Sequence, residues 1–394
     1  MITEKIAIKN PKVFETPIKI EKSFIDAAIE VAIKKLLNDP ARLTMFTPPE
    51  TINYKYEERK NEVEWTSGFN TGVLWLAYEL SGDKRFYDAA KEQVATYKER
   101  FEKKSGLMNH DVGFVFTPSI IADYKITGNE ESRELAIAAA EHLAGEGWSE
   151  KVGYIRRGMG TWPGGFRTLV DTMMNIPLLL WAGRETGREE FTRKAVSHYR
   201  TTEKYLVRED GSTFHHFQFD PATEEPVEGL TLQGFSDASC WSRGHSWLIY
   251  GYPIAYSYTK DEGILPVHSA VTNYFLNSLP SDFIPYWDLI FGEGSTQPRD
   301  ASAAAVSVCG LLEMCRHLPE DAPERKLYKN AADRMMRSLI QRCANLDPER
   351  DGLLAHVTHA LPQGRGIDES AIYGDFFYLE ALLRYKNPDF RMYW

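Results

Sequence analysis

Apolar residues recur every three to four positions along most of the 394-residue chain, which is the spacing of one buried face of an α-helix. Residues 25–36 follow this spacing, as do residues 69–80 and 86–101, and Ser23 is placed to cap the first of these helices. Segment 172–182 is apolar on every side, which is typical of a helix enclosed within the core. The pattern therefore predicts a predominantly helical protein.

Short polar turns separate several of these apolar segments. They begin with Ser or Thr, in three of four cases continue with Gly, and contain an acidic residue: 81–84, 127–130, 186–189 and 259–262. Glycine suits the left-handed C-cap of one helix, and the acid suits the first turn of the next. Because the turns are unequally spaced, a regular solenoid is excluded. We predict one all-α domain of helical hairpins, residues 1–394, of the kind that can close into a toroid.

Signals for β-strands are few. Segment 212–219, with the sequence STFHHFQF, is the best candidate, and we expect a short hairpin arm or an extended loop there. No linker rich in Pro, Gly or Ser divides the chain, so a single domain is favoured over the two or three that its length alone would allow.

The charge balance restricts the possible partners. Lys and Arg total 46 and Asp and Glu total 56, which gives a formal net charge of −10. Binding of nucleic acid needs a basic face, so we expect no nucleic-acid partner, and an anionic ligand would require a local cluster of cations. No apolar run approaches the length of a membrane span, and the first residues contain no signal-peptide core. A cytoplasmic protein without membrane association is expected.

The cysteines give no sign of a metal site or a disulfide framework. Cys240, Cys309, Cys315 and Cys343 form no C-x-x-C pair and lie in apolar helical segments, so buried, reduced thiols are expected. The sequence also lacks an H-x-x-x-H motif and clustered Cys and His. We therefore predict no metal and no cofactor.

Polar residues interrupt the apolar pattern at several points where helices begin or end. They are Asp111 in segment 110–114, Asp171 before the apolar helix, Gln233, Asp237, Trp241, Arg243, His245 and Trp247 in segment 233–247, Asp300, and the acidic residues of 368–380. Carboxylates, an Arg and several Trp at such positions are typical of a carbohydrate site, because glycosidic chemistry needs a proton donor and sugars stack on aromatic rings. An acid beside apolar neighbours would have the raised pKa that a general acid requires.

Each of these residues also has a purely structural interpretation. Asp171 is well placed to cap a helix, and Asp111 could be a turn residue that accepts local amide hydrogen bonds. Arg243 and Trp247 are four residues apart and could form a cation–π pair on one helix face. Trp65 and Trp241 could be ordinary aromatic residues of the core, and His215 could be a polar residue with satisfied hydrogen bonds.

Taken together, these segments resemble the unsaturated glucuronyl hydrolases, glycoside hydrolase family 88, along nearly the whole chain. The resemblance is carried by an ordered set of four segments: HDVGF (110–114), TLVDTMMNIPLLLWA (168–182), LQGFSDASCWSRGHSWLIYGY (232–252) and IDESAIYGDFFYLEALLRY (367–385). It implies an (α/α)6 toroid, a six-hairpin barrel, for a single catalytic domain with a short N-terminal extension of about residues 1–20.

The resemblance also implies an activity. The family acts on oligosaccharides left by polysaccharide lyases, hydrating the C4=C5 enol ether of a 4,5-unsaturated uronic acid, after which a hemiketal opens and releases the next sugar. Asp171 would be the general acid/base and Asp111 the second catalytic carboxylate. The substrate-contacting positions would be Trp65, His215, Gln233, Trp241, Arg243 and Trp247, with Arg243 suited to grip the planar uronate carboxylate. We expect glycosaminoglycan-type disaccharides as substrates and a monomeric enzyme.

The chain departs from the family pattern in places. A Trp that relatives often carry is missing after the stretch Tyr154–Gly158, the usual Gln of an RGQxW motif is His245, and a second Asp is replaced by Ala238. Gln363 stands where a lysine is common, which weakens the expectation of sulfate recognition, although Arg365 could substitute.

Two other functions compete with this interpretation. The unsaturated rhamnogalacturonyl hydrolases share the toroid and the hydration chemistry, but the HDVGF segment and the C-terminal segment favour the first family. A non-catalytic helical repeat that binds a partner or a sugar would explain the hairpins. It would leave Asp111, Asp171 and Arg243 at matched motif positions as a coincidence.

Overall fold

The computed structural model describes residues 6–38, 43–57, 65–161 and 163–394. It is mostly helical, as the hydrophobic spacing predicts. The α-helices are α1 Lys12–Glu15, α2 Lys22–Leu37, α3 Ser67–Ser81, α4 Lys84–Val94, α5 Tyr97–Glu102, α6 Val112–Phe116, α7 Ala122–Thr127, α8 Glu130–Glu146, α9 Pro177–Thr186, α10 Glu189–Tyr205, α11 Ser242–Thr259, α12 Ile264–Ser278, α13 Ala301–His317, α14 Pro323–Ser338 and α15 Ile372–Lys386.

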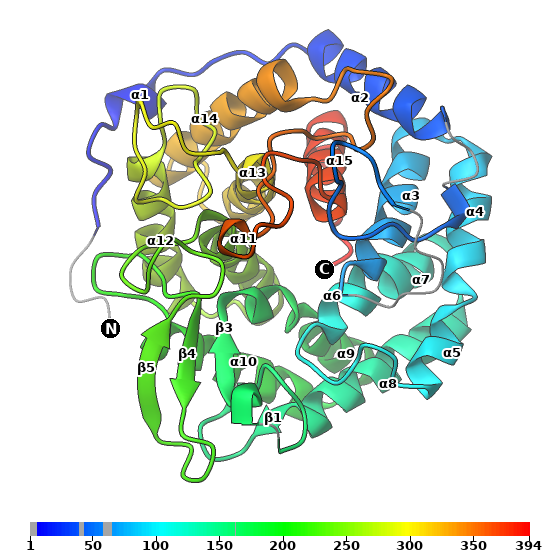
Figure 1. Ribbon diagram of the computed structural model, residues 1–394, viewed down its shortest axis with the longest axis vertical. Coiled ribbons are helices and arrows are strands. Elements are labelled where there is room, and N and C mark those ends of the chain that lie inside the picture. The colour runs from blue at the N-terminus through cyan, green and yellow to red at the C-terminus, as the bar shows by residue number, and fades with distance from the viewer. Residues whose placement is uncertain (1–5, 39–42, 58–64, 162) are drawn as a thin grey trace.

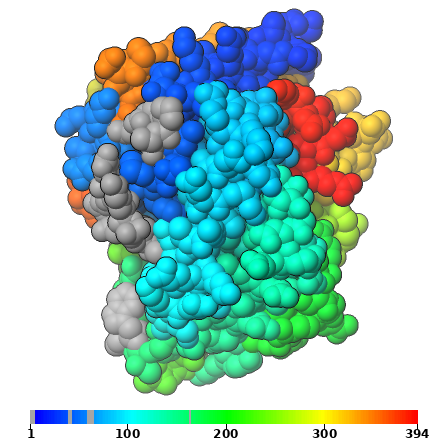
Figure 2. Space-filling model, turned by 90° about the vertical axis from the view of Figure 1, so that its right-hand side faces the viewer, coloured from blue at the N-terminus to red at the C-terminus, as the bar shows by residue number. Residues whose placement is uncertain are grey.

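The helices form two sets that pack against each other. In the first set, α3, α6, α9, α11, α13 and α15, each helix contacts the next, and α15 contacts α3. Each of these helices also packs against one helix of the second set: α4, α8, α10, α12, α14 and α2. Figure 1 shows the chain running around a ring in sequence order, with the C-terminus near its centre. On the face shown in the space-filling view of Figure 2, the colour likewise passes from blue N-terminal residues through cyan to green.

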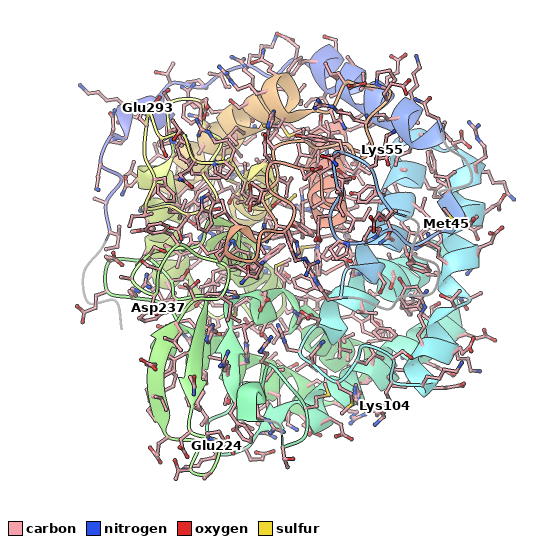
Figure 3. The ribbon with its side chains drawn as sticks, viewed as in Figure 1. Met45, Lys55, Lys104, Glu224, Asp237 and Glu293 are labelled. Carbon is pink, nitrogen blue, oxygen red and sulfur yellow. The ribbon has the colours of Figure 1, made fainter. Side chains whose placement is uncertain are left out.

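The two sets differ in how much of each helix is buried. In α15, every residue from Ile372 to Arg384 is buried, as expected for a helix surrounded by others. In α10, burial is confined to one face, which includes Phe191, Ala195 and Tyr199. Charged residues such as Lys104 and Glu293 lie toward the periphery of the ring (Figure 3).

The four predicted turns end their helices as expected. The residues at the C-caps adopt the left-handed conformation, with φ of 71° at Gly82, 72° at Gly128, 71° at Gly187 and 53° at Lys260. Asp83 then caps the following helix by accepting a hydrogen bond from the Arg85 amide. These turns are therefore correctly identified from the sequence, including the one that lacks glycine.

Helix boundaries differ from the sequence prediction in three places. Helix α2 already begins at Lys22, so Ser23 lies inside it and does not cap it. The predicted helix 86–101 is divided into α4 and α5. Segment 172–182 is not one helix: a short 3₁₀ helix, Val170–Met174, precedes α9, which begins at Pro177. Proline has no amide hydrogen and a fixed φ, so it favours the first position of a new helix.

The predicted strand corresponds to β4, His216–Phe219, the centre of a three-stranded antiparallel sheet. Its neighbours are β3, Arg167–Leu169, and β5, Pro226–Leu230, which the hydrophobic pattern did not reveal. A two-stranded sheet joins β1, Trp148–Ser149, to β2, Tyr154–Ile155. Pairing of β3 with β4 continues as a hydrogen bond from the Val170 amide to the His215 carbonyl, 3.1 Å, which brings two of the predicted site segments side by side.

All four cysteines are buried and unpaired, as expected. Within the described residues, no helix combines the length and the apolar character needed to cross a membrane. Residues 1–5 of the predicted N-terminal extension lie outside the described residues, and α1 packs against α14.

Candidate active site

A cavity of about 680 Å³ brings together all of the site residues predicted from the sequence. Its walls include Trp65, Asp111, Asp171, His215, Gln233, Trp241, Arg243 and Trp247. Gln363 and Arg365, which the sequence analysis considered for sulfate recognition, also line it, as do three residues that were assigned no role there: His110, Arg157 and His359. The residues come from helix ends and loops in distant parts of the chain. The cavity therefore forms only when these parts are folded against one another.

Neither catalytic candidate caps a helix. Asp111 directly precedes α6, but its side chain makes no capping hydrogen bond. Asp171 lies inside the 3₁₀ helix, whose N-cap position is Leu169. The side chains of Asp111 and Asp171 remain 14% and 17% exposed and both line the cavity. The structural interpretations of these two residues, as a cap and as a turn acceptor, are therefore wrong.

A close contact between two segments fixes the relative positions of these carboxylates. Asn175 accepts a hydrogen bond from the Phe114 amide at 2.7 Å and donates one to the Asp171 carbonyl at 3.1 Å. Gly113 approaches the Asn175 backbone so closely that a Cβ would lie 2.3 Å from its carbonyl oxygen. Only glycine fits there, because backbone atoms cannot move aside as a flexible side chain can.

His110 lies between the two carboxylates. Its Nε2 is 3.1 Å from Asp171 Oδ1 and 3.4 Å from Asp111 Oδ1. Its Nδ1 lies 3.1 Å from the carbonyl oxygen of Arg157. The sequence contained a signal for this residue, since His110 stands directly before Asp111, but an adjacent pair does not reveal that the imidazole also reaches Asp171.

The cluster separates the pKa values of its acids. Burial lowers the pKa of His110, but the charges of Asp111 and Asp171 outweigh this and raise it to about 9. Burial would raise the pKa of Asp171, but its contact with His110 holds it below the usual value. Burial does raise the pKa of Asp111, to about 6, against the opposing charge of His110. Two neighbouring carboxyls with separated pKa values are typical of acid–base catalysis.

These three side chains are also compact enough to consider as metal ligands, since one potential ligand atom of each lies within 4.8 Å of the others. Their arrangement is instead that of a donor among acceptors. Nδ1 of His110 faces a carbonyl oxygen, which requires a donor, and Nε2 faces the carboxylate oxygens, whose charges raise the pKa of the ring and favour a second proton there. The geometry is therefore that of a hydrogen-bonded acid–base cluster.

Arg243 is held rigidly at the cavity wall. Its Nη1 donates to Asp300 Oδ2 at 2.7 Å and to the Thr358 carbonyl at 2.8 Å, and its Nη2 donates to the His359 carbonyl at 2.5 Å. The side chains of Arg243 and Asp300 are 1% and 0% exposed. Among the described residues, Nε and the second Nη2 hydrogen of this guanidinium have no hydrogen-bond acceptor.

The aromatic partners of Arg243 differ from the pair considered from the sequence. The guanidinium carbon lies 4.6 Å from the Trp241 ring centre and 4.8 Å from that of Tyr373. The ring contacts of Trp247 are with Phe114 and Phe377. Helical spacing alone misidentified the partner, because Tyr373 arrives from the distant helix α15.

His215 is a neutral hydrogen-bond donor at the site. Its Nδ1 accepts hydrogen bonds from the amides of Leu232, 3.1 Å, and Gln233, 3.2 Å. Burial lowers the pKa of His215 to about 4, so the ring is neutral and its single proton sits on Nε2. Gln233 in turn donates to the His359 carbonyl at 2.9 Å, which leaves its side-chain oxygen as an acceptor.

Trp65 is the aromatic residue best placed to contact a sugar. It is half-buried and stacks against Tyr373, with ring centres 5.4 Å apart and planes inclined by 24°. Trp241 and Trp247 are almost fully buried, although both line the cavity. All three tryptophans thus form part of the cavity wall, and Trp241 and Trp247 also belong to the core.

The departures from the family pattern fall in different environments. His245 is fully buried outside the cavity, with Nε2 2.8 Å from the Val271 carbonyl. At the cavity rim, Gln363 donates to the Leu232 carbonyl at 2.5 Å. Arg365 also lines the cavity, but it is paired with Glu50 at 2.7 Å.

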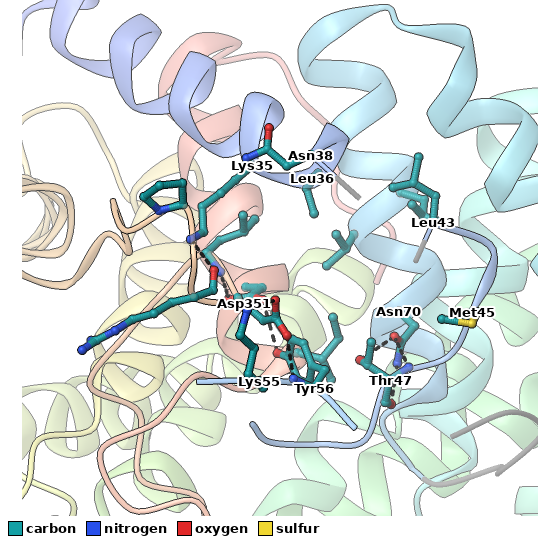
Figure 4. A pocket seen from close by; sticks show the side chains of 18 of the residues that line it. Lys35, Leu36, Asn38, Leu43, Met45, Thr47, Lys55, Tyr56, Asn70 and Asp351 are labelled. Atoms are coloured by element: carbon teal, nitrogen blue, oxygen red, sulfur yellow. Dashed lines mark hydrogen bonds and ion pairs between the residues drawn. The ribbon is translucent and has the colours of Figure 1, made fainter. Parts of the chain in front are cut away.

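A second, smaller cavity of about 270 Å³ is lined by Ile372 and Asp375 at the N-terminal end of α15 and by Lys35, Tyr56 and Asp351 (Figure 4). Asp375 lines it and accepts hydrogen bonds from the amides of Leu353 and Leu354 at 2.8 and 2.9 Å. Lys35 also lines it, but its ammonium donates to two backbone carbonyls, those of Asp347 and Arg350. Burial raises the pKa of Asp375 to about 7.

Comparison with known proteins identifies close relatives. A family model described as Glycosyl Hydrolase Family 88 matches residues 42–287. An unsaturated chondroitin disaccharide hydrolase of Streptococcus pneumoniae is 43% identical over 396 residues, covering 98% of each chain. An unsaturated glucuronyl hydrolase of Bacillus sp. is 36% identical over 330 residues, covering 83% of this chain and 87% of that protein.

Solved structures of unsaturated glucuronyl hydrolases also match this chain. The crystal structure of unsaturated glucuronyl hydrolase from Streptococcus agalactiae matches with a TM-score of 0.95 and 41% identity, covering 100% of this chain and 99% of that one. A mutant of that enzyme complexed with dGlcA-GalNAc6S matches with a TM-score of 0.89 and 40% identity, with the same coverage.

Proposed function

Since the chain belongs to Glycosyl Hydrolase Family 88 and is a glycoside hydrolase, we propose that it is an unsaturated glucuronyl hydrolase acting on glycosaminoglycan-type disaccharides. The observation that carries this function is the cavity in which the Asp111–His110–Asp171 cluster and the fixed guanidinium of Arg243 line the same space. A relative crystallised with dGlcA-GalNAc6S supports the substrate class.

In the proposed reaction, Asp171 delivers a proton to C4 of the unsaturated sugar and activates the water that attacks C5. The resulting hemiketal opens and releases the next sugar. Asp111, with its pKa raised to about 6, binds sugar hydroxyls and shares the charge of the cluster. Because the bond to the anomeric carbon is not displaced, the distance between the carboxylates does not predict retention or inversion.

The other cavity residues would bind and orient the substrate. The free edge of Arg243 faces the uronate carboxylate, and the neutral His215 and Gln233 offer hydrogen bonds to it or to hydroxyl groups. Trp65 supplies a ring face for stacking, while the buried Trp241 and Trp247 shape the wall.

We further propose that the helices form an (α/α)6 toroid within one domain of residues 1–394. The six pairs formed between the two helix sets, and the return contact from α15 to α3, support this arrangement. A cytoplasmic location is supported by the four buried, unpaired cysteines, which suit a reducing compartment.

A substrate panel tests the activity. Purified protein is mixed with lyase-generated unsaturated disaccharides from chondroitin, hyaluronan, heparin and rhamnogalacturonan, and the loss of the conjugated ultraviolet absorbance is followed. We expect turnover of the glycosaminoglycan products. Turnover of the rhamnogalacturonan product alone would establish the competing hydrolase activity, and no turnover of any would favour a non-catalytic binding protein.

Isotope labelling tests the hydration route. In heavy water, solvent deuterium should appear at C4 of the product, and in ¹⁸O-labelled water the oxygen should enter at C5. Label confined to the anomeric carbon, with C4 unlabelled, would mean ordinary glycoside hydrolysis and would contradict the proposed mechanism.

A further inference from the structure

His110 contacts both catalytic carboxylates but is too deeply buried, at 4% exposed, to be the main contact of a substrate. A backbone carbonyl can only accept, so the contact with Arg157 requires a proton on Nδ1. Nε2 faces the oxygens of Asp171 and Asp111, which also require a donor. Protein geometry alone therefore favours the doubly protonated, charged ring.

We propose that His110 is a positioning residue that stores the reaction proton and passes it to the substrate through Asp171. The inference rests on the proposed function, in which Asp171 is the acid. It resolves a difficulty of that function: the contact with His110 keeps Asp171 ionised in the resting site, and an ionised carboxylate has no proton to give.

Protons and electrons balance in this transfer from His110 to the substrate. The Nε2 proton of His110 moves to Asp171 Oδ1 and leaves its electron pair on the nitrogen. Asp171 delivers a proton to C4, where the π pair of C4=C5 forms the new C–H bond. Water then forms a bond to the electron-poor C5, and its released proton returns through Asp171 to Nε2. The imidazolium and the carboxylate are restored after each turnover.

The charged groups around His110 allow its titration to be recognised. Asp111 faces it from its own segment and Asp171 from the 3₁₀ helix, while Arg157 adds a positive charge near Asp111. His198 on α10 and His215 before β4 also interact with it. Burial lowers the pKa of His198 to about 3 and that of His215 to about 4, so neither ring titrates near pH 9.

The variant His110→Gln tests the inference, because an amide can still donate a hydrogen bond to the carboxylates but has no proton to transfer. We expect kcat to fall by about 10²-fold, at the lower end of the range for an acid–base group, with KM changed much less. The alkaline limb of the kcat profile, near pH 9 in the wild type, should move at least one pH unit lower because the proton must then reside on a carboxyl group.

The matched control is His245→Gln, another buried histidine, which lies outside the cavity and should keep the wild-type limb. An unchanged limb in His110→Gln, with kcat within threefold of the wild type, would overturn the inference. If the wild type turns over the disaccharides and Asp171→Asn does not, that result would leave the proposed function standing. An inactive wild type would instead reject the function.

A second measurement does not depend on folding of the His110 variant. In protein labelled at histidine Cε1, NMR titration of the wild type should show a resonance with a midpoint near pH 9. In Asp171→Asn that midpoint should move lower, because a neighbouring negative charge is lost. If no histidine resonance titrates above pH 8 and responds to this substitution, the stored proton does not exist.

Discussion

Two aspartates, one in each cavity, show what loss of hydration alone does to a carboxyl group and what a charged neighbour adds. Asp375 in the smaller cavity accepts two backbone amide hydrogen bonds, and burial still raises its pKa to about 7. Asp171 in the larger cavity is also removed from water, but contact with His110 lowers its pKa.

At Asp171 the charge of His110 outweighs the loss of hydration and lowers the pKa, whereas at Asp375 the two neutral amide donors do not offset burial. The smaller cavity holds a carboxyl poised between its two forms, with Lys35 engaged elsewhere. The larger cavity holds a carboxylate together with its proton source. Among the described residues, the two cavities therefore differ in whether a charged group contacts the carboxyl.

Neutralising each aspartate in turn tests whether the two cavities differ in function. In Asp171→Asn, the rate should fall roughly 10²–10⁴-fold because an amide cannot exchange the proton. In Asp375→Asn, the side-chain oxygen can still accept both amide hydrogen bonds, so the rate should stay near that of the wild type. Both are measured by loss of ultraviolet absorbance under identical conditions, and equal losses would remove the distinction between the cavities.

Substitution of Arg243 removes a positive charge that is held rigidly at the wall of the larger cavity. Arg243→Ala leaves Asp300 buried without its partner, so the free energy of unfolding should fall by about 3–5 kcal/mol. A loss of stability therefore cannot separate a structural from a binding role. The two roles are separated by kcat/KM of Arg243→Lys, normalised to the concentration of folded enzyme. The single charge of Lys should not replace the two-pronged hydrogen bonding of a guanidinium, and wild-type kinetics in this variant would refute carboxylate binding.

The raised pKa of Asp375 in the smaller cavity should make the stability of the protein depend on pH. The pKa of Asp375 rises from 3.8 to about 7 on folding, so its proton stabilises the folded state, and this stabilisation is lost as pH rises through that window. Asp375→Asn should therefore gain stability relative to the wild type between pH 5 and 8, by an amount on the order of 3 kcal/mol at most. Urea unfolding at both pH values measures it, and a pH-independent difference would contradict the raised pKa.

The smallest effect concerns the rim of the larger cavity. With Gln363 in place of a lysine and Arg365 paired with Glu50, unsulfated disaccharides should be turned over at least as well as sulfated ones. Gln363→Lys should raise kcat/KM for a sulfated disaccharide by a few-fold, an effect of up to about 1 kcal/mol for an exposed charge pair. A clear preference of the wild type for the sulfated substrate would point to another cation.

Local chemistry made much of the fold predictable. The glycine-containing turns at Gly82, Gly128 and Gly187 could be located because a left-handed C-cap strongly favours that residue. Strands β3 and β5 could not, because each is short and depends on pairing with β4 and not on its own composition. The break before Pro177 was available from the sequence but was outweighed by the apolar run around it.

The sequence predicted which residues line the cavity better than it predicted which residues contact one another. Each predicted residue lies on the cavity, since the motif segments that carry the resemblance converge there. The partners of those residues were not predictable: His110 reaches Asp171, 61 positions away, and Arg243 meets Tyr373 from another helix. Such contacts depend on how distant elements pack, which local spacing does not encode.

The contact between Gly113 and Asn175 limits how this protein can change under selection or in a designed library. A side chain at position 113 would push apart the segments that bear Asp111 and Asp171, and loss of Asn175 would leave the Phe114 amide unpaired. Single-site randomisation at either position should return almost only inactive clones, and the two positions should show strong epistasis. New specificities are therefore more accessible through the loop that carries Gln363, where substitutions leave that contact untouched.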